Sequence, residues 1–421
     1  MGGAPILPPR RARRAPRNAA ATGPRRRGYD ARMARGFLIA FLLSFGPTVS
    51  NSFARFAYAL VLPAMRTDLA LDWSSAGWLN TANAIGYLGG ALLARFLVRT
   101  AGNRALFSAG MLITAAALLA TGLVRDVGAL SLARALSGVG GAMVFVCGGA
   151  LSGNVFPGQP QRATTTIAIY FAGGGFGLML CGVAVPLLLR ELGDAAWPIA
   201  WRAMGAASFA MAAASVWAAY RIEEPGAAPG SAEWRLAPFL PQFLSYVCFG
   251  LGYIGYMTFV IAWMRVNGAG TGLVIAVWTV LGAATLAAPA VWAGPCERWR
   301  GGRPLAAVMA VLATGAILPM ASVHPAAMLA SAALFGVAMF SSPSAVSSLI
   351  KHLLPKPAWG SAMATFTVAF AASQIVGPVA TGWIADRSGS LRPGLTASAA
   401  VLALGALLAL LQRDPRPRPA G

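Results

Sequence analysis

Twelve long apolar runs limit what this chain can fold into more than any other feature of its sequence. A helix that crosses a bilayer needs about 20 mostly apolar residues. Breaks at charged, Pro or Gly clusters leave twelve such runs in the 421 residues. The runs are 36–63, 74–94, 105–124, 128–153, 164–189, 203–220, 238–264, 271–294, 305–322, 326–350, 358–383 and 393–411. We therefore predict an all-α membrane protein with twelve transmembrane helices. At 57% hydrophobic and 11% charged residues, the chain leaves no room for a separate soluble domain.

The charge balance is strongly basic, with 33 Lys and Arg against 12 Asp and Glu. In a soluble protein this balance would favour nucleic acid as a partner. An even number of spans places both termini on one side of the membrane, and that side holds 24 of the 33 basic residues. Since Lys and Arg accumulate on the cytoplasmic side, we expect cytoplasmic termini, a bacterial inner (plasma) membrane location and no nucleic-acid partner.

The polar segments divide the chain into five parts. Residues 1–35 carry ten Arg among Pro, Ala and Gly and are expected to form a disordered cytoplasmic tail, with Met33 as an alternative start. The other parts are a six-helix bundle at 36–220, a cytoplasmic linker at 221–237, a second six-helix bundle at 238–411 and a tail at 412–421. The four Cys residues are scattered without metal-ligand spacing, so we expect them to pack in the core.

The two bundles resemble one another as internal repeats. At an offset of 198, Arg55 aligns with Tyr253, and at an offset of 200, Gly177 aligns with Gly377. Similar matches occur in order along the chain, and both repeats begin on the same side of the membrane. The sequence therefore predicts two pseudo-symmetric bundles with a solute site between them near mid-membrane.

Short motifs at matching places resemble the major facilitator superfamily over nearly the whole chain. The fourth span reads R-A-L-S-G-V-G-G-A from Arg134, and the eleventh contains Q-I-V-G-P from Gln374 and is followed by A-D-R-S-G from Ala385. The loop after the second span departs from the superfamily pattern, because Arg99 stands where an Asp is usual. More narrowly, the chain is similar to the YbfB/YjiJ-like branch.

This resemblance implies the major facilitator fold and a secondary active or facilitative transporter that works by alternating access. It also implies a set of gating or structural motif residues. These are Gly102, Arg104, Gly138, Gly177, Gly377, Pro378, Asp386 and Arg387.

Two arginines inside the predicted spans are the leading functional candidates. Arg55 lies about 12 Å and Arg134 about 9 Å from the outer ends of their spans, at about 1.5 Å per residue. A charge inside the bilayer marks a functional site unless it is paired or reaches the interface. With no Asp or Glu within the predicted spans, these cations favour a small organic anion as substrate.

Polar and aromatic side chains at compatible depth complete the predicted substrate site. The full set is Arg55, Tyr58, Asn80, Asn83, Tyr87, Arg134, Tyr170, Tyr253, Tyr256 and Gln374. The alternative for each is a hydrogen bond between helices with no role in binding.

Several other functions remain as alternatives. A multidrug or metabolite efflux antiporter is the main one, although Gly177 is followed by Leu178 rather than the Pro typical of drug antiporters. A channel is disfavoured because no ring of charge or filter-like run appears. The sequence lacks clustered catalytic or metal-ligating residues, so we expect no enzyme activity, no cofactor and no metal. The expected partners are a small-molecule substrate, the lipid bilayer and a coupling ion, with the protein acting as a monomer.

Overall fold

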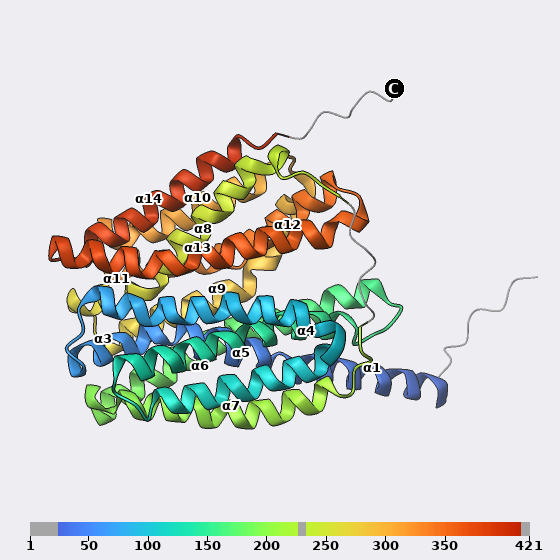
Figure 1. Ribbon diagram of the computed structural model, residues 1–421, viewed down its shortest axis with the longest axis horizontal. Coiled ribbons are helices and arrows are strands. Elements are labelled where there is room, and N and C mark those ends of the chain that lie inside the picture. The colour runs from blue at the N-terminus through green and yellow to red at the C-terminus, as the bar shows by residue number, and fades with distance from the viewer. Residues whose placement is uncertain (1–23, 226–232, 414–421) are drawn as a thin grey trace, which may run out of the picture.

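The computed structural model describes residues 24–225 and 233–413, and all regular elements in these residues are helices (Figure 1). The first half contains α1 (Pro24–Leu43), α2 (Phe45–Pro47), the π-helical η1 (Thr48–Phe56), α3 (Tyr58–Asp68), α4 (Trp73–Thr121), α5 (Val127–Gly153), α6 (Pro160–Leu192) and α7 (Trp197–Ala219). The second half contains α8 (Leu240–Val266), α9 (Thr271–Arg298), α10 (Arg303–Ala321), α11 (Pro325–Met339), α12 (Ser342–Leu353), α13 (Trp359–Ser388) and α14 (Leu391–Leu410). Three short 3₁₀ helices cover Asp194–Ala196, Ala237–Phe239 and Lys356–Ala358.

All twelve predicted spans fall on helices, although the described residues form eleven helical stretches long and apolar enough to cross a membrane. The difference arises at α4, which joins the second and third spans in one helical stretch. Gly102 stands at the junction with φ 80° and ψ 163°, a conformation that is readily available only to glycine. This residue turns the chain between two membrane passes, so the prediction of twelve passes holds.

Two boundaries differ from the sequence prediction. Helix α1 begins at Pro24, whereas we predicted a disordered tail up to residue 35. Proline is well tolerated in the first turn of a helix, because the backbone N–H that it lacks would have no hydrogen-bond partner within the helix at that position. The remainder of the predicted tail, residues 1–23, lies outside the described residues, as do residues 414–421 of the C-terminal one. The predicted tenth span is divided at Phe340 and Ser341 into α11 and α12.

The helices form two halves that lie one above the other in Figure 1. The halves meet chiefly through three helix pairs, α4 with α13, α6 with α9, and α3 with α8. Helix α1 begins at the right of the figure and α14 runs toward that side, which we call the tail end. Helix α3 ends and α14 begins at the left, which we call the far end. This arrangement places α4 and α13 along the same interface between the halves.

Small residues allow the helices to pack closely. A Cβ on Gly86 of α4 would lie 1.9 Å from the carbonyl oxygen of Ala135, and one on Gly138 of α5 would lie 2.0 Å from that of Asn83. Any side chain at either position would force the two helices apart. The four cysteines are free and buried, which confirms that they pack in the core.

Candidate functional site

Arg55 lies in the π-helical segment η1, between α2 and α3. The amide of Ala57 donates to the Ser52 carbonyl at 2.7 Å, an i to i−5 bond that marks the wider helix. Segments of this kind often occur at functional sites. The Arg55 side chain is only 6% exposed.

The Arg55 guanidinium reaches across the interface to the second half. Its Nη2 donates to Oε1 of Gln374 on α13, and the Tyr253 hydroxyl on α8 donates to the same oxygen at 2.7 Å. Arg55 and Tyr253, aligned by the sequence repeat, therefore meet on one acceptor. The Arg55 guanidinium also lies 5.1 Å from the centre of the Tyr87 ring on α4. Four of the predicted site residues, one from each of four segments, are thus brought together.

The Nε atom of Arg55 is buried and has no hydrogen-bond partner in the part of the chain that the structure describes. Among the described residues, the salt bridges are Arg104–Glu224, Arg125–Asp68 and Arg190–Glu191, so no carboxylate neutralises Arg55. A buried cation without an anion is unfavourable in a membrane-spanning bundle. The cluster therefore offers both charge and an N–H donor to an incoming anion.

Arg134 has a different environment from Arg55, although the sequence predicted the same role for both. Its side chain is completely buried. Nη1 donates to the Ala54 carbonyl at 2.5 Å, Nη2 to Oδ1 of Asn80 at 3.3 Å and Nε to the Leu79 carbonyl at 3.5 Å. The guanidinium also lies 4.8 Å from the Tyr58 ring centre and 5.3 Å from that of Trp201. In this conformation Arg134 braces α5 against η1 and α4 and is not exposed for binding.

Asn80, which accepts a hydrogen bond from Arg134, also contacts the second half of the protein. Its Nδ2 donates to Oγ1 of Thr258 on α8 at 2.6 Å. Thr258 was not predicted, and nothing in its sequence position distinguishes it from other threonines in apolar helices.

The four other predicted lining residues form hydrogen bonds within their own half. Asn83 donates to the Arg134 carbonyl and to Ser137, and Tyr58 donates to the Ala76 carbonyl. Tyr170 donates to the Val144 carbonyl, and the Tyr256 hydroxyl shares a hydrogen bond with Ser331. The structure does not bring these side chains to Arg55. An apolar pocket between η1, α6 and α7 contains none of the predicted site residues.

The motif residue Asp386 joins the halves at the far end. Its carboxylate accepts the backbone N–H groups of Trp73 and Ser74, both at 2.8 Å, and the Ser74 hydroxyl. It thereby caps α4 from the opposite half, while Asp72 caps the same helix end through Ser75. The hydrogen bonds from Ser75 hold the pKa of Asp72 below its ordinary value. A carboxylate at a helix N-terminus is favoured by the unpaired N–H groups and the helix dipole.

The contact between α4 and α13 is closest near this far end. A Cβ on Gly77 would lie 2.4 Å from the Pro378 carbonyl oxygen, and Thr81 donates to the Ile375 carbonyl at 2.7 Å. One helical turn further along the same stripe of α4, Ile85 is 42% exposed, and Val368 of α13 is 37% exposed. The two helices therefore separate toward the tail end.

The remaining motif residues have packing roles. A Cβ on Gly177 would lie 2.7 Å from the side chain of Ser52, and one on Gly377 would lie 2.4 Å from the Leu251 carbonyl oxygen. The Arg387 guanidinium lies 4.9 Å from the Trp383 ring centre.

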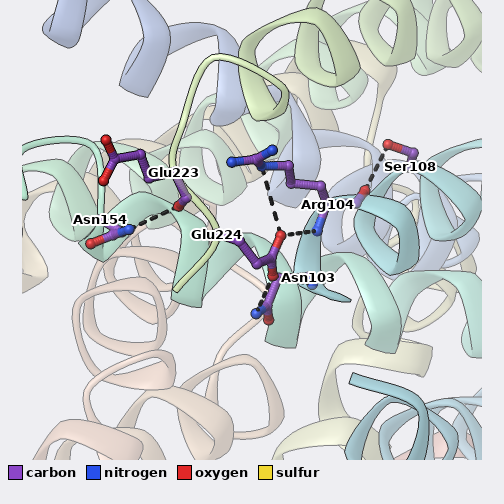
Figure 2. A network of polar contacts seen from close by, with 6 residues as sticks. All are labelled: Asn103, Arg104, Ser108, Asn154, Glu223 and Glu224. Carbon is purple, nitrogen blue, oxygen red and sulfur yellow. Dashed lines mark hydrogen bonds and ion pairs between the residues drawn. The ribbon is translucent and has the colours of Figure 1, made fainter. Parts of the chain in front are cut away.

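At the tail end, the motif residue Arg104 belongs to a network built on Glu224 (Figure 2). The motif residue Gly102 lies beside it, since a Cβ at this position would be 3.2 Å from the Glu224 carboxylate carbon. The Glu224 carboxylate accepts the Asn103 backbone N–H, the Asn103 amide group at 2.8 Å and the Arg104 N–H at 3.3 Å. Its Oε2 also lies 3.7 Å from Arg104 Nε. Sequence reasoning did not single out Glu224. The sequence signal that could have identified it is an acidic residue shortly after the sixth span. The loop after the second span lacks the Asp that is usual in the superfamily, because Arg99 occupies that position.

The Glu224 network predicts a pH-dependent contribution to stability. Partial burial raises the pKa of Glu224, but the hydrogen bonds from Asn103 and Arg104 outweigh it and lower the pKa overall. A lowered pKa stabilises the fold above the unfolded-state pKa, and this stabilisation is lost as the pH falls through the folded-state value. We expect Glu224→Gln to lose about 1 kcal/mol of unfolding free energy near pH 7, because the site is partly exposed.

Thermal unfolding of both proteins at about pH 7 and about pH 3 would test this expectation, since protonation should remove the difference. Glu223→Gln is the matched control, because only the backbone carbonyl of Glu223 is used, as the acceptor of the Asn154 amide at 2.8 Å (Figure 2). A difference between wild type and Glu224→Gln that persists unchanged at low pH would contradict the assignment.

Comparison with known proteins agrees with this architecture. Over 89–90% of the chain, the fold matches a bacterial homolog of the human lysosomal transporter Spinster in an inward-facing, unoccupied conformation (TM-score 0.69, 14% identity) and a D-xylose–proton symporter (TM-score 0.68, 16% identity). Each match covers 96% of the solved chain. Because the sequence identities are low, these matches support only the fold.

Two curated relatives match shorter regions. The puromycin resistance protein pur8 of Streptomyces alboniger is 32% identical over 138 residues, which are 33% of this chain and 27% of that protein. Nitrate transporter 2.2 of Chlamydomonas reinhardtii is 30% identical over 173 residues, which are 41% of this chain and 33% of that protein. The matched regions thus span about a third or less of either relative.

A protein family described as the uncharacterised MFS-type transporter YbfB matches residues 48–410, where MFS denotes the major facilitator superfamily. This match includes every predicted span except the start of the first and the last residue of the twelfth. The resemblance inferred from the sequence motifs is therefore confirmed, and the chain is a multi-pass membrane protein that belongs to the YbfB-like family of major facilitator transporters.

Proposed function

We propose that this transporter is a secondary carrier that moves a small anion across the membrane and holds it at Arg55. The observation that carries the proposal is the buried guanidinium of Arg55, which has an unpartnered Nε and no neutralising carboxylate among the described residues. An anion placed there would neutralise the charge and accept the free N–H. Because Arg55, Gln374 and Tyr253 come from both halves of one chain, a monomer suffices for transport.

We further propose that the tail end faces the cytoplasm of a bacterial cell and that the structure represents an inward-facing state. The excess of Lys and Arg at the tail end supports this orientation. The hydrogen bonds of Asp386 hold the halves together at the opposite end. Transport would then require these bonds to break while the halves close at the tail end.

Efflux of drugs is the second candidate, since part of the chain is similar to a puromycin resistance protein. A cationic drug would be repelled by Arg55, so the geometry favours an anion. The similarity to a nitrate transporter is in line with this preference. A channel is less favoured, because the direct bonds between the halves at the far end have to rearrange before a solute can pass.

Ligand-induced stabilisation of the purified protein tests the proposal directly. A ligand at about 100 times its Kd stabilises the native state by about 2.7 kcal/mol. We expect organic anions to raise the melting temperature and cationic dyes to leave it unchanged. Stabilisation by cationic dyes alone would contradict the proposal and support the efflux alternative.

Removal of the Asp386 carboxylate should open the far end. Asp386→Ala removes three hydrogen bonds between the halves. Each is worth about 1 kcal/mol net, so the population open at the far end should rise by about tenfold or more. Thr81→Cys reports on this interface when it is made in protein whose four natural cysteines are replaced. Thr81 is 2% exposed and lies beside Ile375, so a reagent reaches a thiol there only when the far end opens.

We expect a membrane-impermeant maleimide to label the thiol introduced by Thr81→Cys faster in Asp386→Ala. Asp126→Ala is the control, since Asp126 caps α5 within the first half through Ala129. Equal labelling rates in the two carboxylate variants would show that Asp386 does not hold the far end closed.

A further inference from the structure

The surroundings of Arg55 are aromatic in the first half of the protein. The Tyr87 ring lies under the Arg55 guanidinium, and its centre is 6.4 Å from that of Phe145 on α5. The Phe145 ring centre is in turn 4.9 Å from that of Phe171 on α6, which is 36% exposed. This row of rings runs from Arg55 toward the tail end, where α4 and α13 separate.

A second aromatic group approaches Arg55 from the other half. The Phe249 ring on α8 is stacked on Tyr253 at 4.8 Å with an interplanar angle of 18°, and on Phe370 of α13 at 5.1 Å with an angle of 8°. Tyr253 lies at the end of this stack, and its hydroxyl donates a hydrogen bond to Gln374. Gln374 also accepts a hydrogen bond from Arg55. Phe370 is one helical turn from Gln374 toward the tail end, and its side chain is partly exposed.

The two aromatic groups converge on Arg55 and its partner Gln374 from opposite halves of the protein. Tyr87 packs against Ala371, the residue after Phe370, and against Ala142 in a separate apolar cluster. The guanidinium therefore lies at the junction of two sets of flat rings that extend in the same direction. A small inorganic anion would use only the guanidinium, whereas a planar ring attached to the anionic group could also pack on these faces.

We propose that the Arg55 site binds aromatic carboxylates, with the carboxylate at the unpartnered Nε and the ring between the Tyr87–Phe145 row and Phe370. This inference rests on the proposed anion-carrier function and makes its substrate more specific. The carboxylate accepts a charge-assisted hydrogen bond, and the ring gains edge or face contacts beyond simple apolar burial.

Isothermal titration of the purified full-length protein with benzoate, cyclohexanecarboxylate, acetate and nitrate tests this inference. We expect benzoate to bind about tenfold more tightly than cyclohexanecarboxylate, because a favourable contact between aromatic rings adds about that much affinity. Acetate and nitrate should bind more weakly still. Phe145→Leu and Phe370→Leu should each weaken benzoate binding by about tenfold and leave acetate binding unchanged.

The control variant is Phe209→Leu, which alters a phenylalanine that is 38% exposed on α7, away from Arg55. It should leave the binding of all four anions unchanged. If the four anions bind without preference for a ring but lose binding in Arg55→Gln, the aromatic inference is overturned and the anion carrier stands. If no anion binds in an Arg55-dependent way, the proposed function itself is overturned.

Discussion

Arg55→Gln should abolish saturable anion uptake while the protein still folds. The substitution removes the charge of a guanidinium that, among the described residues, donates to Gln374 and lies over the Tyr87 ring. Truncating one partner of a buried charge pair costs about 2–5 kcal/mol. We therefore expect uptake by reconstituted protein to fall by about 100-fold, which corresponds to about 3 kcal/mol.

Two further variants complete this experiment, a conservative substitution of Arg55 and a substitution of an exposed arginine elsewhere in the protein. Arg55→Lys keeps the charge but loses the planar fork, so it should retain part of the uptake. Arg190→Gln is the matched control, because Arg190 is exposed and pairs with its neighbour Glu191. Uptake by Arg55→Gln at the wild-type rate, in protein with the wild-type melting temperature, would show that the anion binds elsewhere.

Arg134→Gln should instead impair folding. Its guanidinium donates to the Ala54 and Leu79 carbonyls and to Asn80 in a fully buried site, and Gln cannot reach all three acceptors. Each lost hydrogen bond to a charged group costs about 1.5–3 kcal/mol. We expect a loss of at least about 3 kcal/mol of stability, seen as reduced monodisperse yield and a lower melting temperature.

Arg202→Gln serves as the control for Arg134, because it changes an exposed arginine on α7. It should behave as wild type in both assays. An Arg134→Gln protein that melts normally and has lost anion uptake would place Arg134 among the binding residues, in contradiction to the bracing role.

The contrast between the two arginines shows where sequence reasoning stops. Both lie at similar depth in apolar spans, so their positions predicted the same role. What separates them is the direction of each side chain and the carbonyl groups within reach, which depend on how η1, α4 and α5 pack. The partner of Arg55, Gln374, lies 319 residues away in the sequence and was predicted only as a separate polar candidate.

The fold was predicted more completely because apolar length and charge asymmetry are local signals. The repeat alignment even paired Arg55 with Tyr253, which meet on Gln374. The predicted break between the second and third spans is confirmed at Gly102, whose φ and ψ are non-helical, although the residues on either side of it are helical. The capping role of Glu224 depends on contacts between segments more than 100 residues apart, which a single sequence does not reveal.

Counterflow in proteoliposomes tests the central claim, an alternating-access carrier that binds its anion at Arg55. Vesicles are preloaded with unlabelled benzoate or with buffer, and the uptake of labelled benzoate is then followed at increasing external concentrations. We predict saturable uptake that preloading accelerates in the wild type and that is absent in Arg55→Gln. Uptake that is linear in concentration and indifferent to both preloading and the substitution would contradict the account.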